Sequence, residues 1–264
     1  MGLFDRIGAA FGSGSAVLEL AIETPQIYRG RKISGEVVLI GGKVSQKVRM
    51  VTVDLYEFWI SGHGKNRRHH QRREERIVLA EYIVTEPESS HTYPFTLQIP
   101  DAARCTRRRE GWEVRSEAHV AWAVDPKVSS PLRIIPQAEV LAVQRAVRDL
   151  FRFQPLEWDG RSEAIIYNFR PPQDMRSVVD GIRFHLSVAG DELHARLDVN
   201  RQEKNLTDVL GSIVGRDHEE IHLVIPRRDL LTKKGSPYPA GAYEHLKPVL
   251  DRLAGSGQTV SAHT

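Results

Sequence analysis

Cysteine, lysine and long apolar stretches are all scarce in this sequence of 264 residues. Cys105 is the single cysteine, so no intramolecular disulfide is possible, and we expect a reducing, cytoplasmic location. No apolar stretch approaches the roughly 18 residues that a membrane-spanning helix needs. The first residues also lack the charged start, the long apolar segment and the small-residue cleavage site of a secretory signal.

Composition limits the function classes further. The apolar and charged fractions, 41% and 27%, are those of a globular protein, and the length allows one large domain or two ordinary sandwiches. The formal net charge of +3 is too small to make the whole chain a nucleic-acid binder. The sequence contains no glycine-rich phosphate loop, dinucleotide fingerprint or G-x-S-x-G nucleophile elbow. We therefore predict no catalytic residues and no cofactor.

Short strand-like segments follow one another between residues 17 and 136. Val51, Val53 and Leu55 alternate with polar residues, as a half-buried strand requires. Pro94 near the start of its segment indicates an edge strand, because proline cannot donate to a ladder. This pattern predicts a β-sandwich, a scaffold that more often binds than catalyses.

The pattern changes at Gln137. Val140, Val143 and Val147 recur at helical spacing, which predicts a short helix connecting two β-rich halves. More strand-like segments follow, and Leu206 to Val214 fits either a helix or a strand. The predicted boundaries are a first sandwich with its amphipathic start over 1–136, a connecting helix over 137–149, a second sandwich over 150–230, a closing helical segment over 231–254 and a disordered tail over 255–264.

Turn glycines, prolines before strands and core aromatics occur as an ordered set, best defined over residues 1–155. They are Tyr28-Arg29-Gly30, Ile33-Ser34-Gly35-Glu36-Val37, Gly41-Gly42, Pro94-Phe95, Ile99-Pro100, Ala121-Trp122-Ala123-Val124-Asp125-Pro126, Ile135-Pro136 and Leu150-Phe151. This set resembles the bacterial sporulation-control proteins of the arrestin-like superfamily. The resemblance implies an all-β chain of two arrestin-like β-sandwich domains in tandem, with a short connecting helix and a C-terminal helix. It also implies an interaction or regulatory module that binds a protein partner without cofactor or turnover.

One motif favours an enzyme instead. Residues 218–222 fit H-E-x-x-H, in which a helix places His218 and His222 on one zinc ion with Glu219 as the base. A zinc-dependent hydrolase is therefore the alternative interpretation. The alternating apolar residues over 221–226 predict a strand, where the two histidines would lie roughly 13 Å apart at about 3.3 Å per residue. We therefore predict no metal site here, and the helicity of this segment is the discriminator.

Basic residues concentrate in three connections between the predicted strands. They are Arg29, Arg31 and Lys32 in the first, Lys65, Arg67, Arg68, Arg72 and Arg73 in the third, and Arg104, Arg107, Arg108 and Arg109 in the fifth. Because successive strands cross a sandwich in opposite directions, these connections should converge at one end. The acidic connection around Glu86-Pro87-Glu88 should lie at the other end. We hypothesise that the basic end binds a partner with acidic or phosphate groups, since arginine pairs bidentately with both.

The same concentration of charge fits two further interpretations. Arginine outnumbers lysine 28 to 9, so the clusters are also compatible with a proteome rich in arginine. Nucleic acid is a less favoured ligand, because no aromatic residue lies between Ser61 and Arg76 to stack on bases.

The first residues form a short amphipathic segment. Leu3, Phe4, Ile7 and Phe11 recur at helical spacing before a break rich in glycine and serine. The segment predicts a helix docked on its own domain. A further alternative is a peripheral membrane adaptor that uses this segment as a surface anchor.

Cys105 is the remaining candidate for chemistry. Three arginines follow within four residues, and such neighbours favour a thiolate. We nevertheless interpret Cys105 as a solvated loop cysteine.

Overall fold

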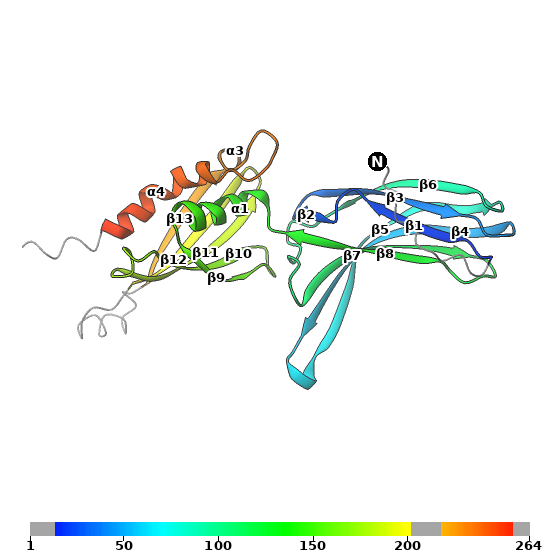
Figure 1. The fold of residues 1–264 in the computed structure, drawn as a ribbon, viewed down its shortest axis with the longest axis horizontal. Coiled ribbons are helices and arrows are strands. Elements are labelled where there is room, and N and C mark those ends of the chain that lie inside the picture. The colour runs from blue at the N-terminus through cyan, green and yellow to red at the C-terminus, as the bar shows by residue number, and fades with distance from the viewer. Residues whose placement is uncertain (1–13, 202–217, 256–264) are drawn as a thin grey trace, which may run out of the picture. The chain divides into compact units, whose positions relative to one another are not determined.

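A computed structural model describes residues 14–201 and 218–255, which fold as two compact units (Figure 1). Unit 1 is Met1–Ile135 and unit 2 is Pro136–Thr264. The described strands form three sheets, and the few helices include one near the C-terminus, so the chain is mostly β. No described helix is long and apolar enough to cross a bilayer. The predicted amphipathic segment, Leu206–Val214 and the predicted tail beyond residue 255 lie outside the described residues.

Unit 1 contains a three-stranded and a five-stranded sheet. The strands are β1 (Val17–Ile22), β2 (Gln26–Tyr28), β3 (Lys32–Ile40), β4 (Gln46–Ser61), β5 (Arg68–Thr85), β6 (Ser90–Gln98), β7 (Glu110–Val120) and β8 (Lys127–Ile135). The first sheet has the order β1-β3-β6 and the second has the order β2-β8-β7-β4-β5. The short β2 pairs with β8 in parallel, and the other pairs of unit 1 are antiparallel.

The two sheets of unit 1 share one apolar core. Leu39 faces this core from the first sheet, and Val51, Val53 and Leu55 face it from the second. All four side chains are fully buried, and each such burial stabilises the fold by about 1.5–3 kcal/mol. The apolar face predicted for β4 is thus confirmed, but the strand is not half-buried, because Thr52 and Asp54 on its other face are buried as well. The edge position predicted for Pro94 is confirmed too, because β6 is the last strand of its sheet.

A long hairpin, β4–β5, projects past the other strands of unit 1 (Figure 1). Its tip contains a short 3-10 turn over Gly64–Asn66 (η1). Pairing with β4 continues as far as Arg68, so Arg68, Arg72 and Arg73 lie on a strand. The prediction that they belong to a loop was wrong, because β4 continues to Ser61 and its residues 56–61 pair with this polar segment.

Unit 2 has one five-stranded antiparallel sheet among its described residues, in the order β13-β12-β11-β10-β9. The strands are β9 (Gln154–Asp159), β10 (Ile165–Arg170), β11 (Val179–Ala189), β12 (Glu192–Arg201) and β13 (His218–Pro226). The helical elements are α1 (Ala138–Arg145), a π-helical turn η2 (Ala146–Leu150), α3 (Arg227–Leu230) and α4 (Pro239–Gly255).

Helices cover the apolar face of this sheet. Phe169, Phe184 and Leu197 are buried on adjacent strands, α1 packs on β11, and α4 packs on α1. The helix predicted over 137–149 is therefore part of unit 2, with Val140 and Val143 fully buried. A sandwich over 150–230 would require a second sheet, and the described strands of unit 2 form one. The helices bury the apolar face that a second sheet would otherwise cover.

Candidate functional site

The structure brings the three basic connections of unit 1 together. Arg29, in the first, donates from Nε to the carbonyl of Ala103 in the fifth. Arg109, in the fifth, donates from Nη1 to the carbonyl of Gly62 in the third at 3.2 Å, and its own carbonyl accepts the N–H of Ile60 at 2.9 Å. The convergence expected from alternating strand directions is therefore confirmed. We call residues 29–32, 62–68 and 101–109 the basic end.

The predicted basic residues differ in exposure. Arg31, Lys65, Arg67, Arg68, Arg73, Arg107 and Arg108 are exposed. Arg29 is only 2% exposed, so its assignment to the binding surface was wrong. Its side chain is buried and donates a hydrogen bond to the carbonyl of Ala103 in the fifth connection. Arg72 forms ion pairs with Glu57 and Glu74. Arg109 is half-buried because the hairpin tip engages it.

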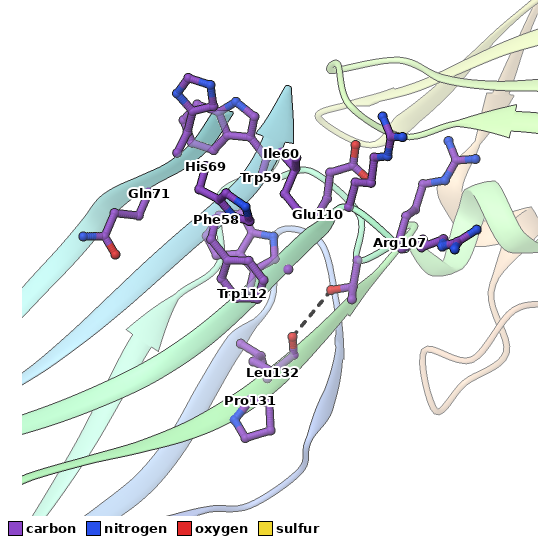
Figure 2. A pocket seen from close by; sticks show the side chains of 15 residues that line it. Phe58, Trp59, Ile60, His69, Gln71, Arg107, Glu110, Trp112, Pro131 and Leu132 are labelled. Atoms are coloured by element: carbon purple, nitrogen blue, oxygen red, sulfur yellow. Dashed lines mark hydrogen bonds between the residues drawn. The ribbon is translucent and has the colours of Figure 1, made fainter. Parts of the chain in front are cut away.

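A pocket of about 800 Å³ lies at the basic end (Figure 2). Phe58, Trp59 and Trp112 supply its aromatic wall, from β4 and β7. Arg107 and Arg108 line it from the fifth connection. The arrangement places two guanidinium groups beside an apolar surface, which strengthens their electrostatic attraction for an anion.

The aromatic wall is held by specific contacts. Trp112 is buried, and its indole N–H donates to the carbonyl of Arg104 at 2.7 Å. The Phe58 ring lies directly over the Cα of Gly111, where any Cβ would overlap the ring. Glycine at this position therefore lets the Phe58 ring lie flat against β7.

A chain of charged and aromatic contacts continues from this wall. The Arg104 guanidinium lies 4.4 Å from the Trp59 ring centroid, and the His70 ring stacks on Trp59 at 5.1 Å. Glu57, 1% exposed, forms ion pairs of 3.1 Å with both Arg104 and Arg72. Burial raises the pKa of Glu57, while the two guanidinium groups act to lower it.

The hydroxyl groups near the pocket either hydrogen-bond to the backbone or lack the partners of a catalytic nucleophile. Thr106 Oγ1 accepts the N–H of Ile134 at 2.9 Å. Ser61 Oγ and His70 Nε2 lie 2.7 Å apart. A serine nucleophile needs a third group that orients the imidazole, and no carboxylate within residues 14–201 and 218–255 is hydrogen-bonded to His70. Ser61 and His70 therefore lack the third group of a serine-nucleophile triad among the described residues.

Cys105 lies within the fifth connection but is buried. Burial raises the pKa of its thiol to about 11, although Arg29 and Arg107 act to lower it. The interpretation as a solvated loop cysteine was wrong, because the side chain points into unit 1. The raised pKa lowers the thiolate fraction of Cys105 at neutral pH.

The H-E-x-x-H motif lies on a strand, because residues 218–222 belong to β13. Residues four apart on a strand share a face but are separated by roughly 13 Å, so His218 and His222 cannot bind one zinc ion. Glu219 forms ion pairs with Arg201 and with Arg252, at 2.5 and 3.2 Å. The motif therefore contributes to the sheet of unit 2 instead of a hydrolase site.

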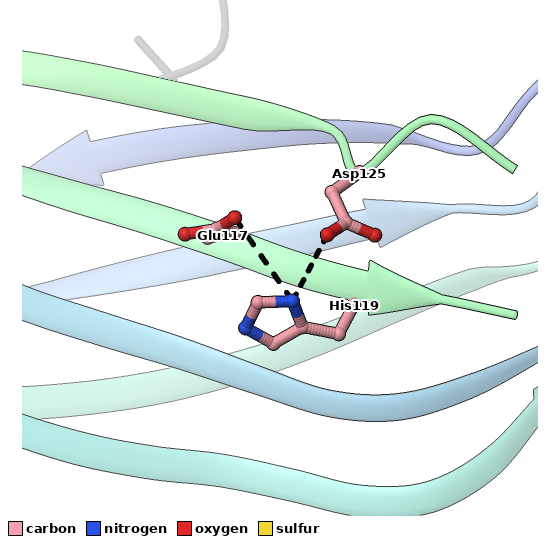
Figure 3. A group of neighbouring side chains, drawn as sticks. All are labelled: Glu117, His119 and Asp125. Carbon is pink, nitrogen blue, oxygen red and sulfur yellow. Dashed lines mark hydrogen bonds and ion pairs between the residues drawn. The ribbon is translucent and has the colours of Figure 1, made fainter.

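A second cluster was not predicted from the sequence. Glu117 and His119 lie on one face of β7, and Asp125 reaches them from the turn to β8 (Figure 3). His119 Nδ1 lies 3.0 Å from Asp125 and 4.0 Å from Glu117. The conformation of the β7–β8 turn brings Asp125 close to His119, and the spacing of these residues in the sequence does not reveal this proximity.

The contacts of this cluster give it a structural role. Lys127 Nζ lies 2.7 Å from Glu117, and Asp125 accepts the N–H of Val120 at 2.9 Å. Burial acts to raise the pKa of Asp125, but the Val120 N–H and the His119 ring lower it overall. An ammonium group already holds Glu117 and would repel a bound cation. Asp125 therefore caps the β7–β8 turn.

Comparison with known proteins gives consistent matches. Residues 4–203 match the model of the Spo0M family, described as SpoOM protein. The sporulation-control protein Spo0M of Bacillus subtilis (strain 168) is 26% identical over 105 residues, 38% of this chain. That alignment spans 39% of the relative's own length. The crystal structure of Spo0M from Bacillus subtilis is similar in fold, with a TM-score of 0.62 and 16% identity over 91% of this chain and 100% of that chain.

Proposed function

Because the chain belongs to the Spo0M sporulation-control family, we propose that it is a non-catalytic regulator whose basic end binds a protein partner. The pocket recognises acidic or phosphate groups of that partner. The proposal rests on one observation: Arg107 and Arg108 are exposed beside an aromatic wall that Trp112 and Gly111 fix in place. Both guanidinium groups are accessible to a ligand from solvent.

The physical basis is electrostatic and geometric. A cluster of like charges raises the local potential, which speeds the encounter with an oppositely charged partner. Arginine then pairs bidentately with a carboxylate or a phosphate, so binding is directional as well as attractive. Phe58, 40% exposed, offers apolar contact for the chain that bears the anion. Together these features suit a short acidic peptide segment.

The structure offers less support for nucleic acid than for an acidic peptide as the ligand of the basic end. Trp59 is the aromatic side chain best placed to stack on a base, but His70 and Arg104 already lie against its ring. A base would have to displace one of them. The stacking contribution of roughly 1–3 kcal/mol per base is therefore reduced at this site.

We also propose that unit 1 is an arrestin-like β-sandwich, which its two sheets around one core support. The same proposal for unit 2, as the second of a tandem pair, finds less support, because its described strands form one sheet covered by helices. A cytoplasmic location is part of the proposal, and the buried Cys105, a free thiol, is compatible with it.

The test measures binding of the full chain to synthetic peptides. The probes are a glutamate-rich peptide, a peptide of the same length with phosphoserine, a neutral peptide and a single-stranded oligonucleotide. We expect the two acidic peptides to bind more tightly than the neutral peptide. Affinity should fall with added salt, since exposed charges are screened. The preferred acidic peptide identifies carboxylate or phosphate as the ligand group.

The variant Arg107→Ser with Arg108→Ser removes the two exposed pocket arginines. We expect it to weaken binding of the acidic peptides about tenfold or more, at about 1.5–3 kcal/mol for each charge-assisted hydrogen bond lost. The matched control is Arg170→Ser with Arg228→Ser, two exposed arginines of unit 2. Equal affinities for the two double variants, or tighter binding of the oligonucleotide, would contradict the proposal.

A further inference from the structure

The end of unit 1 opposite the basic end exposes large apolar side chains. Trp122 is 101% exposed and Val124 is 82% exposed, both in the turn between β7 and β8. Val44, 62% exposed, lies in the turn between β3 and β4. A fully exposed tryptophan contributes no buried area to the core, so it adds nothing to the hydrophobic stabilisation of unit 1.

Trp122 also has an unfavourable backbone conformation. Its φ is +63°, a left-handed value that is uncommon for bulky side chains and costs roughly 1–2 kcal/mol. Glycine or asparagine would adopt the same turn at lower cost. Asp125 holds the backbone of this turn within unit 1, but the exposed Trp122 ring gains nothing there, which points to a role of the ring outside unit 1.

These turns are adjacent in space. Ala121, next to Trp122, donates its N–H to the carbonyl of Lys47 at 2.8 Å, near the start of β4. Lys43, next to Val44, donates its N–H to the carbonyl of Gly14 at 3.0 Å. The first described residue of the chain thus lies at the same end. The amphipathic residues Leu3, Phe4, Ile7 and Phe11 precede it by a few positions. We call residues 43–45 and 121–124 the apolar end.

Charge at this end is balanced. Lys43, Lys47 and Arg49 are exposed, and so are Glu81, Glu86 and Glu88. An acidic or basic protein partner therefore gains little from electrostatic attraction here. The apolar side chains project from hairpin turns rather than lining a groove, which suits insertion into a fluid phase. Tryptophan is enriched at membrane–water interfaces because its large apolar ring has one polar N–H.

From these observations we propose that the apolar end inserts into the headgroup region of a lipid bilayer, with Trp122 as the main anchor. Val124 and Val44 enter beside it. This proposal is independent of the ligand of the basic end.

The experiment measures sedimentation of the full chain with phosphatidylcholine vesicles and with vesicles of phosphatidylcholine and phosphatidylglycerol. We expect binding to both, with little effect of added salt, because insertion is apolar. Trp122→Asn removes the ring and keeps a residue that tolerates a positive φ. We expect it to lower the partition constant about tenfold or more, since burial of a large apolar side chain changes an equilibrium by one to two orders of magnitude.

Two further measurements make the test specific. Leu156→Asn, at an exposed apolar residue of unit 2, is the matched control and should bind like the natural chain. Brominated phosphatidylcholine should quench the fluorescence of the natural chain and quench that of Trp122→Asn much less. Absent vesicle binding, or vesicle binding equal in Trp122→Asn and the natural chain, would overturn the proposal. So would loss of binding on deletion of residues 1–12 while Trp122→Asn has no effect.

Discussion

The two ends of unit 1 differ in how their side chains are held. At the basic end, Trp112 donates to the carbonyl of Arg104, and Arg104 in turn pairs with Glu57 and covers Trp59. At the apolar end, Asp125 fixes the backbone of the turn, while Trp122 extends into solvent. Contacts at the basic end hold the side chains of the pocket wall, whereas contacts at the apolar end hold the backbone of the turn and leave the Trp122 ring exposed.

This difference matches two kinds of ligand. Recognition of a carboxylate or a phosphate depends on direction, so the groups around the arginines must be fixed before the ligand arrives. Partition into a bilayer interface depends on area and has no preferred direction. A side chain that inserts into lipid therefore needs no fixed neighbours. Three variants test this contrast, from the largest expected effect on stability to the smallest.

Arg104→Met should be the most damaging change. It removes the guanidinium that pairs with the buried Glu57 and leaves only Arg72, a half-exposed partner. Loss of one partner from a fully buried pair costs roughly 3–5 kcal/mol, and the remaining Arg72 reduces this to about 2 kcal/mol. Urea unfolding at neutral pH measures the change. Arg133→Met, at an exposed arginine of β8, is the control and should unfold like the natural chain.

The same variant should show a characteristic pH dependence. The pKa of Glu57 is raised in the folded chain above its ordinary value of 4.5, so the folded state binds its proton more tightly than the unfolded state does. The stability that this proton provides is present below pH 4.5 and is lost as the pH rises through the folded pKa. Without Arg104 the folded pKa rises further. The difference between Arg104→Met and the natural chain should shrink on acidification, and a difference independent of pH would contradict this account.

Gly111→Ala should have an intermediate effect. The new Cβ would overlap the Phe58 ring, which is partly exposed and swings outward at a cost of about 1 kcal/mol. We expect a modest fall in the free energy of unfolding and a clear loss of affinity for acidic peptides, because the aromatic wall moves. Gly255→Ala, where a Cβ meets open space, is the control. Unchanged peptide affinity in Gly111→Ala would show that the position of Phe58 does not matter for binding.

Trp122→Asn should leave stability almost unchanged. The ring makes no buried contact, and asparagine relieves part of the cost of the positive φ. We expect a change of less than about 0.5 kcal/mol, in the stabilising direction, by thermal unfolding. A loss well above this value would mean that Trp122 packs within unit 1, and the contrast between the two ends would fail.

The sequence predicts much of the frame of unit 1. Alternation identifies the buried face of β4, and the missing N–H of Pro94 identifies an edge strand. Counting strand directions predicts that three basic connections converge. These are local or topological rules, and each depends on the type of a single residue or on the order of the elements.

The sequence does not predict which polar side chains are buried or which partners they bind. Arg29 and Arg31 are two residues apart in one basic connection, yet the first is buried and the second exposed. The burial of Cys105 and the hydrogen bond of Asp125 to Val120 likewise depend on the direction in which the local backbone points each side chain. The helical cover of unit 2 was also missed, because an apolar face requires a cover but does not specify whether a sheet or a helix provides it.

β4 runs from one end of unit 1 to the other. Near the start of β4, the carbonyl of Lys47 accepts the N–H of Ala121. Near its end, the N–H of Ile60 donates to the carbonyl of Arg109, and 13 residues separate Lys47 from Ile60. At about 3.3 Å per residue, these contacts are roughly 40 Å apart. The ladders with β5 and β7 keep β4 extended, so it acts as a spacer of set length. A partner captured at the arginines would stand at a defined height above the bilayer.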